Sequence, residues 1–154
     1  MKGTGMIQRF FLAVTILLFT AMNASMALAQ MVSVKGAKVN MRSGPGKNHA
    51  ILWELGRGYP LLIFGQEGNW LKVKDFEGDT GWIYKTLISD KPHLIVKKKR
   101  INLRSGPGTK YKIVGQANYG VVLATLGQPT KGWVKVKHDN GLSGWTKRDL
   151  LWGW

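Results

Sequence analysis

The chain has 154 residues and a formal net charge of +15, and it contains no cysteine. Disulfides and thiolate metal sites are therefore excluded, and no cofactor is expected. The charge is uneven, because residues 31–90 hold eight Lys and Arg against six Asp and Glu, whereas residues 91–154 hold thirteen against two. The second half is expected to supply most of the attraction for polyanions.

Residues 1–29 have the composition of a secretory signal peptide. Two cations precede an apolar run from Phe10 to Met22, and small residues follow it up to Ala29. Such a segment is removed on export, here before Gln30. A membrane anchor is the alternative, although the run is shorter than the ~20 apolar residues of a membrane span. We expect a periplasmic or secreted protein that has no membrane span after cleavage and no nucleic-acid partner.

The rest of the chain is a tandem repeat. The stretch VNMRSGPG, which begins at Val39, recurs 62 residues later as INLRSGPG. One inserted residue in the segment PTKG raises the offset to 63, at which Trp70 matches Trp133. Residues 31–90 and 93–154 are therefore predicted to be two copies of one domain.

Each copy is predicted to be all-β. Short apolar runs such as WLKVK and TGWIY, separated by glycines and acidic turns, are typical of strands, and Asn140-Gly141 is typical of a two-residue hairpin. Strands of this length and spacing favour a small barrel. The core positions are expected to match by offset, in the pairs Met41 with Leu103, Ile51 with Ile113, Leu61 with Leu123 and Val73 with Val136.

Three sequence marks occur in both copies: the opening N-x-R-S-G-P, a Trp-x-x-Val segment in mid-domain, and a late Gly-Trp followed by Leu. On these marks the chain resembles bacterial SH3 domains, and the terminal DLLWG resembles the tandem type found in exported proteins. The resemblance covers nearly the whole chain after the signal peptide. It implies SH3-like barrels of five to six strands and peptidoglycan as a ligand, since better-understood members bind it and often accompany wall hydrolases.

A Trp followed by two alternate Lys is the main candidate for ligand binding. Strand alternation places these side chains on the face opposite the core. An indole ring can stack on a sugar or peptide plane while the ammonium groups meet carboxylate or phosphate. The alternative is that the Trp rings pack structurally against the RSGPG turns. The residues are Trp70, Lys72 and Lys74 in the first copy, and Trp133, Lys135 and Lys137 in the second.

A basic run in the second copy is the other candidate. It comprises Lys97, Lys98, Lys99 and Arg100, which we group with Arg104 as a patch for anions. The alternative is a solvated edge whose charges prevent pairing with another strand.

No set of residues predicts catalysis or a metal site. The three histidines lack the spacing of metal ligands, and Asp75, Glu77 and Asp79 fall in one hairpin loop. We therefore expect a non-enzymatic, monomeric binding protein of the bacterial envelope. Its expected partner is a cell-wall glycan or peptide, namely peptidoglycan or an associated anionic polymer. The alternative is an adaptor that docks an envelope enzyme or a secretion partner.

Overall fold

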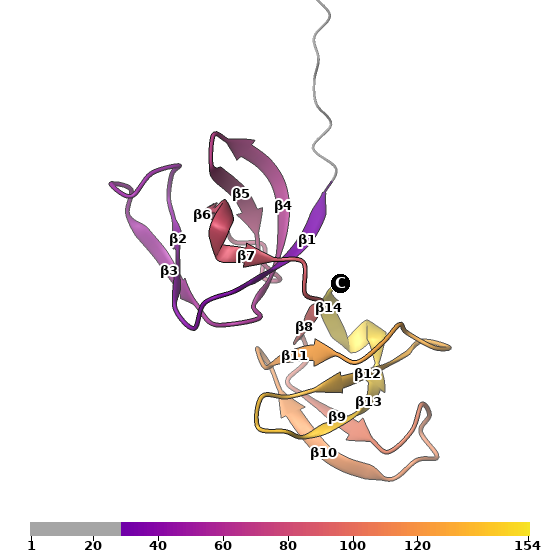
Figure 1. The fold of residues 1–154 in the computed structure, drawn as a ribbon. Coiled ribbons are helices and arrows are strands. Elements are labelled where there is room, and N and C mark those ends of the chain that lie inside the picture. The colour runs from indigo at the N-terminus through magenta and orange to yellow at the C-terminus, as the bar shows by residue number, and fades with distance from the viewer. Residues whose placement is uncertain (1–28) are drawn as a thin grey trace, which may run out of the picture.

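The computed structural model describes residues 29–154, so the predicted signal peptide lies outside the described residues except for Ala29. Two antiparallel sheets of seven strands each account for the described chain, and Figure 1 shows them as two barrel-like bodies. The all-β expectation is confirmed. Each copy has more strands than the five to six implied by the resemblance, because a short strand follows the last 3-10 turn. Within residues 29–154, no helix is long and apolar enough to cross a membrane.

The first sheet has the strand order β3-β2-β6-β5-β4-β1-β7. A connection of two residues, 68–69, joins β4 to β5, and η1 follows β6 directly. Its elements are β1 (Gln30–Val34), β2 (Val39–Arg42), β3 (Ile51–Leu55), β4 (Pro60–Glu67), β5 (Trp70–Lys74), β6 (Thr80–Tyr84), the 3-10 turn η1 (Lys85–Leu87) and β7 (Ile88–Ser89).

The second sheet repeats this topology in the order β10-β9-β13-β12-β11-β8-β14. Every strand occupies the place of its counterpart in the first sheet, so the repeat in sequence is a repeat in structure. Its elements are β8 (His93–Val96), β9 (Arg100–Arg104), β10 (Ile113–Asn118), β11 (Val122–Thr125), β12 (Trp133–Lys137), β13 (Ser143–Lys147), the 3-10 turn η2 (Arg148–Leu150) and β14 (Leu151–Gly153).

Each barrel has its own apolar core, built from alternate residues of the strands. Burying a Leu or Val side chain of this kind stabilises the fold by ~1.5–3 kcal/mol, and nine buried residues form each core. Three of the four predicted core pairs are confirmed as fully buried: Met41 with Leu103, Leu61 with Leu123, and Val73 with Val136.

The fourth predicted pair is wrong. Ile51 is 54% exposed and Ile113 is 50% exposed. Both residues begin β3 and β10, which lie at the ends of their sheets, and a register shift interrupts the pairing of each strand with its neighbour. Only the far end of each strand reaches the core, at Leu55 and Ala117. The regular alternation assumed from the sequence therefore fails along these edge strands.

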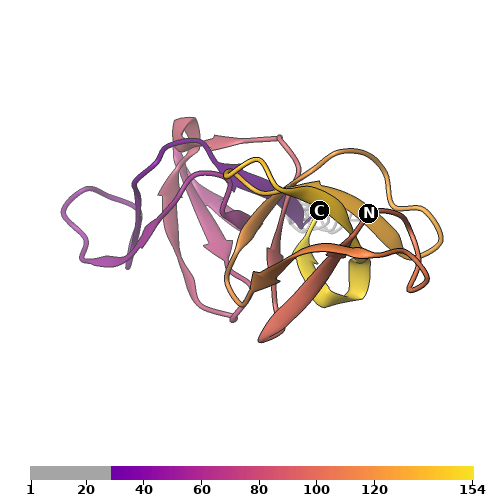
Figure 2. The ribbon, with the colours of Figure 1, turned by 90° about the horizontal axis from the view of Figure 1, so that it is seen from below.

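The two barrels are packed against each other, and they lie side by side in Figure 2. Ser33 on β1 and Ile95 on β8 are equivalent positions, 62 residues apart, and both are fully buried. Alternation turns Ile95 away from the core residues beside it, and its strand contacts β4 of the first barrel. Across the same junction, the Phe76 and Tyr119 rings are 5.3 Å apart and the Tyr119 hydroxyl donates to Glu77.

Candidate ligand-binding grooves

The RSGPG turn of the first copy is held closed by the arginine that opens it. Nη1 of Arg42 donates hydrogen bonds to the carbonyl oxygens of Lys47 and His49, at 3.0 and 2.8 Å. The His49 ring also covers Gly44 so closely that a Cβ there would lie 2.4 Å from the ring. The motif therefore specifies a compact loop, and its glycine is required by the ring packed on it.

The second copy uses the same construction. Nη1 of Arg104 donates to the carbonyl oxygens of Thr109 and Tyr111, at 3.0 and 2.9 Å. The Tyr111 ring replaces His49 over Gly106, where a Cβ would lie 2.5 Å from the ring. Arg104, predicted as part of an anion-binding patch, thus has one guanidinium nitrogen engaged with the loop. Arg104 also lines the groove beside Trp133 that is described below.

A groove of about 630 Å³, the first groove, lies beside Trp70. Trp70 packs edge-to-face on Tyr84, with ring centroids 5.4 Å apart, which fixes an aromatic wall. The RSGPG loop contributes Lys47, and β2 and η1 close the other sides. The lining residues are Lys38, Val39, Asn40, Arg42, Lys47, Trp70, Tyr84, Thr86 and Leu87.

A groove of about 190 Å³, the second groove, lies at the equivalent place beside Trp133. Most of its lining residues occupy positions that match the first groove by the repeat offset. Trp, Asn and Arg are the same in both, whereas Tyr84 is replaced by Lys147. The lining residues are Arg100, Ile101, Asn102, Arg104, Thr109, Trp133, Thr146, Lys147 and Leu150.

A further hollow of about 570 Å³, the side hollow, shares Trp133 and Lys147 with the second groove. Its other lining residues include Lys97, Lys131 and a single acid, Asp149. Trp133 therefore lines two depressions whose charged residues, apart from Asp149, are all cations. This arrangement favours anionic ligands that present a flat ring to the indole.

The structure separates the predicted Trp residues from their predicted Lys partners. Trp70 and Trp133 are half-buried and line the grooves. Lys72 is exposed and lies over the Phe64 and Trp82 rings, at 5.4 and 5.8 Å from their centroids. The other Lys residues of these two strands are exposed and line neither groove nor the side hollow: Lys74, Lys135 and Lys137.

The basic run is exposed throughout but divides between two sites. Arg100 lines the second groove, where its Nε donates to the Asn118 side chain at 3.3 Å, and Lys97 lines the side hollow. Lys98 and Lys99 line neither. The run thus contributes to the cationic surroundings of Trp133 at two of its four positions.

Sequence reasoning missed several lining residues that come from other parts of each domain. Asn40 and Asn102 belong to the repeated motif, which is a signal that could have identified them. Tyr84, Lys131 and Lys147 lie far from the motif in sequence and reach the grooves only through folding.

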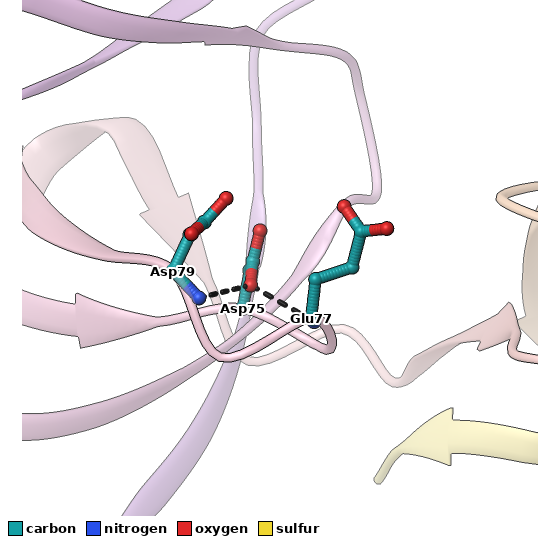
Figure 3. Close-up of side chains that lie close together, drawn as sticks. All are labelled: Asp75, Glu77 and Asp79. Carbon is teal, nitrogen blue, oxygen red and sulfur yellow. Dashed lines mark hydrogen bonds between the residues drawn. The ribbon is translucent and has the colours of Figure 1, made fainter.

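Asp75, Glu77 and Asp79 bring their carboxylate oxygens within 4.8 Å of one another (Figure 3). One oxygen of the buried Asp75 accepts backbone N–H bonds from the other two residues, both at 2.9 Å, and the second oxygen accepts from the Tyr59 hydroxyl at 3.4 Å.

Burial, and then the charge of Asp75, raises the pKa of Tyr59. The hydrogen bond to Glu77 raises the pKa of Tyr119. The cluster therefore closes its hairpin and joins the barrels.

Two family models, both described as bacterial SH3 domain, match residues 35–90 and 99–151. Together these matches cover more than two thirds of the 154 residues. The matched ranges contain both grooves and both RSGPG turns.

A curated relative, "Putative N-acetylmuramoyl-L-alanine amidase YrvJ" of Bacillus subtilis (strain 168), is 24% identical over 160 residues. The alignment covers 94% of this chain but only 30% of the relative's length.

Solved structures with similarity include NlpC2 from Trichomonas vaginalis and an NlpC/P60 family protein from Bacillus cereus ATCC 10987. The first is 18% identical, with a TM-score of 0.36, and the match covers 80% of this chain and 48% of that one. The second is 16% identical, also with a TM-score of 0.36, and the match covers 81% of this chain and 56% of that one.

Proposed function

Because the chain belongs to the bacterial SH3 domain family and carries two such domains in tandem, we propose that it is a non-enzymatic binding protein of the bacterial cell envelope. Its two grooves hold peptidoglycan or an anionic polymer associated with peptidoglycan. The protein acts outside the cytoplasm, as its predicted signal peptide requires.

The observation that carries this proposal is the recurrence of one groove in both copies. Each groove combines a half-buried Trp, an Asn from the motif, and cations on its rim. A Trp that served only the core would not need polar and cationic residues around it. In these grooves a sugar or peptide plane can stack on the indole, while the Asn amide and the cations bind the polar groups of that ligand. The name of the Bacillus subtilis relative refers to N-acetylmuramoyl-L-alanine, an amide of muramic acid, which supports a wall ligand.

The placement of the histidines supports a role without catalysis. Nδ1 of His93 lies 3.2 Å from the hydroxyl of Ser33 and 3.0 Å from the carbonyl oxygen of Lys91, at the junction of the barrels. Ser33 is fully buried and donates to the same carbonyl at 2.7 Å, so its hydroxyl is closed to a substrate. The pair therefore connects the two domains.

Co-sedimentation with purified sacculi tests the proposed function. We expect the full chain to pellet with sacculi at low salt and less at 1 M salt, where the Debye length falls to ~3 Å. Trp70→Ala and Trp133→Ala should each weaken retention, since stacking contributes on the order of 1–3 kcal/mol by analogy with nucleic-acid platforms.

Trp53→Ala is the matched control, because Trp53 is 51% exposed and lines neither groove. Equal losses for all three Trp variants would contradict a role for the grooves. The adaptor alternative, in which an envelope protein fills the grooves, predicts no retention of the full chain on protein-free sacculi.

A further inference from the structure

Two lysines near Trp133 stand where the first copy has uncharged residues. Lys131 stands at the position of Gly68, and Lys147 stands at the position of Tyr84. The first groove therefore has a second aromatic ring beside its Trp, and the second groove has an ammonium group there. These two exchanges change the chemistry of the site while the fold around it is retained.

Lys131 is held at the side hollow by a backbone that disfavours lysine. Residues Lys131 and Gly132 form the two-residue turn between Thr130 and Trp133, whose backbone groups bond to each other at 2.7 and 2.9 Å. Both turn residues have positive φ, at 48° and 79°. This is the geometry of a type I′ turn, for which Asn-Gly is preferred at the same two positions. Turn stability therefore does not explain a lysine at position 131, whereas a charged ligand in the hollow does.

The cations line both of the depressions that Trp133 shares. Lys97 and Lys131 line the side hollow, Arg100 lines the second groove, and Lys147 lines both. A ligand that stacks on Trp133 and satisfies these cations must carry negative groups on two sides of one ring. The carboxylates of peptidoglycan sit on peptide stems, and a uronic acid carries one carboxylate on the ring. In a sugar-phosphate chain, by contrast, a phosphodiester flanks the sugar on either side.

Resting on the proposed function, we propose that the second barrel binds a polymer of phosphodiester-linked sugars. A sugar ring lies on Trp133, one phosphate lies in the side hollow near Lys97 and Lys131, and the next lies in the second groove near Arg100. Lys147 contacts both phosphates from the shared wall.

Fluorescence titration of the full chain with four polymers tests this inference. The probes are a phosphodiester-linked polysaccharide, polygalacturonate of similar charge density, inorganic polyphosphate and neutral dextran. We expect the phosphodiester-linked polysaccharide to bind tightest, because only this probe supplies both the ring and the flanking phosphates. Vesicles of anionic phospholipid are added as a fifth arm, and weaker binding to them assigns the phosphate to a polymer instead of a lipid surface.

Two exchanges separate binding from folding. Lys131→Asn should keep or raise the melting temperature, since Asn suits the turn. It should also weaken binding of the phosphodiester polymer about fivefold, which is the affinity that one lysine contributes near an anionic surface. Lys147→Tyr installs the residue of the first copy and should have a similar effect. Lys137→Asn is the control with the same change of charge, because Lys137 is exposed and lines neither the second groove nor the side hollow.

Equal losses for Lys137→Asn and Lys131→Asn would overturn the inference, because binding would then follow net charge alone. Polygalacturonate or polyphosphate binding as tightly as the phosphodiester polymer would also overturn it. If sacculi stripped of phosphate polymers retain the chain and its Lys131→Asn variant as well as untreated sacculi do, the inference fails and the proposed function stands. If no sacculus preparation retains the chain, the proposed function itself fails.

Discussion

Replacing Thr146 by Val should stabilise the second barrel. Thr146 is 1% exposed, and its hydroxyl oxygen has no hydrogen-bond partner among residues 29–154. The equivalent residue of the first copy is Ile83, which is fully buried in the core of its barrel. The second barrel thus keeps a hydroxyl at a position where the first has only hydrocarbon.

The magnitude follows from the cost of a buried polar group without a partner, which is ~1–3 kcal/mol in proteins. Val has the same shape as Thr and suits a strand, so the change leaves no cavity. We expect a gain of about 1–2 kcal/mol in the free energy of unfolding. For a unit of this size, each kcal/mol shifts the melting temperature by roughly 4–8 °C.

Thermal melts followed by circular dichroism, together with urea titrations, measure this gain. Thr125→Val is the matched control, because the Thr125 hydroxyl donates to the carbonyl oxygen of Pro92 at 3.3 Å. That variant should lose stability by about 1 kcal/mol. A lower melting temperature for Thr146→Val would refute the reasoning, since it would mean that the hydroxyl is satisfied, for example by a buried water.

Three further predictions concern the two cores, the pKa of Tyr59 and the groove residue Trp133. Leu61→Ala and Leu123→Ala should each lower the free energy of unfolding by ~2–5 kcal/mol, measured by urea titration. Ile51→Ala should lower it by less than ~1 kcal/mol, because that side chain is exposed. A large loss for Ile51→Ala would mean that Ile51 belongs to the core after all. Burial raises the pKa of Tyr59 above its ordinary value of 10.0, so the folded state keeps a proton that the unfolded state releases, and stability should fall as the pH rises above about 10. Tyr59→Phe should reduce that fall in melts recorded from pH 8 to 11, and an unchanged pH profile would argue against it. Trp133→Ala should lower the free energy of unfolding by about half of the ~3–5 kcal/mol typical of a core Trp, because the ring is half-buried. Loss of the whole of that amount in thermal melts would show that the ring has only a structural role.

The fold was predictable from the sequence because the repeat and the strand alternation are both local signals. Alternation correctly placed Leu61, Val73 and their partners inside the barrels. It failed at Ile51, because the sequence does not show which strand lies at a sheet edge. Edge position depends on the pairing of distant segments, and so does the register shift that accompanies it.

The candidate site was predictable only in part, for a related reason. The repeated Trp70 and Trp133 were singled out from the sequence, and the structure places both in grooves. The alternate Lys residues that follow each Trp lie on the same face of the strand, but they do not line the grooves. Lys72, for example, lies over the Phe64 ring. The cations near Trp133 include Lys97 and Arg100 of the predicted basic run, and the others come from a turn and from the end of β13, so no short sequence window contains them all.

The junction between the barrels has a consequence for long, repetitive ligands. Ile95 and Ser33 are fully buried there, and the Tyr119 hydroxyl bonds to Glu77, so the two barrels share a packed junction. Under the proposed function, a polymer held in one groove meets the other at an effective concentration set by the geometry of this junction. Chains whose repeat length matches the spacing of the grooves would gain avidity, and mismatched chains would bind through one barrel only. Binding by the pair of domains would then depend on the periodicity of the ligand as well as on its chemistry.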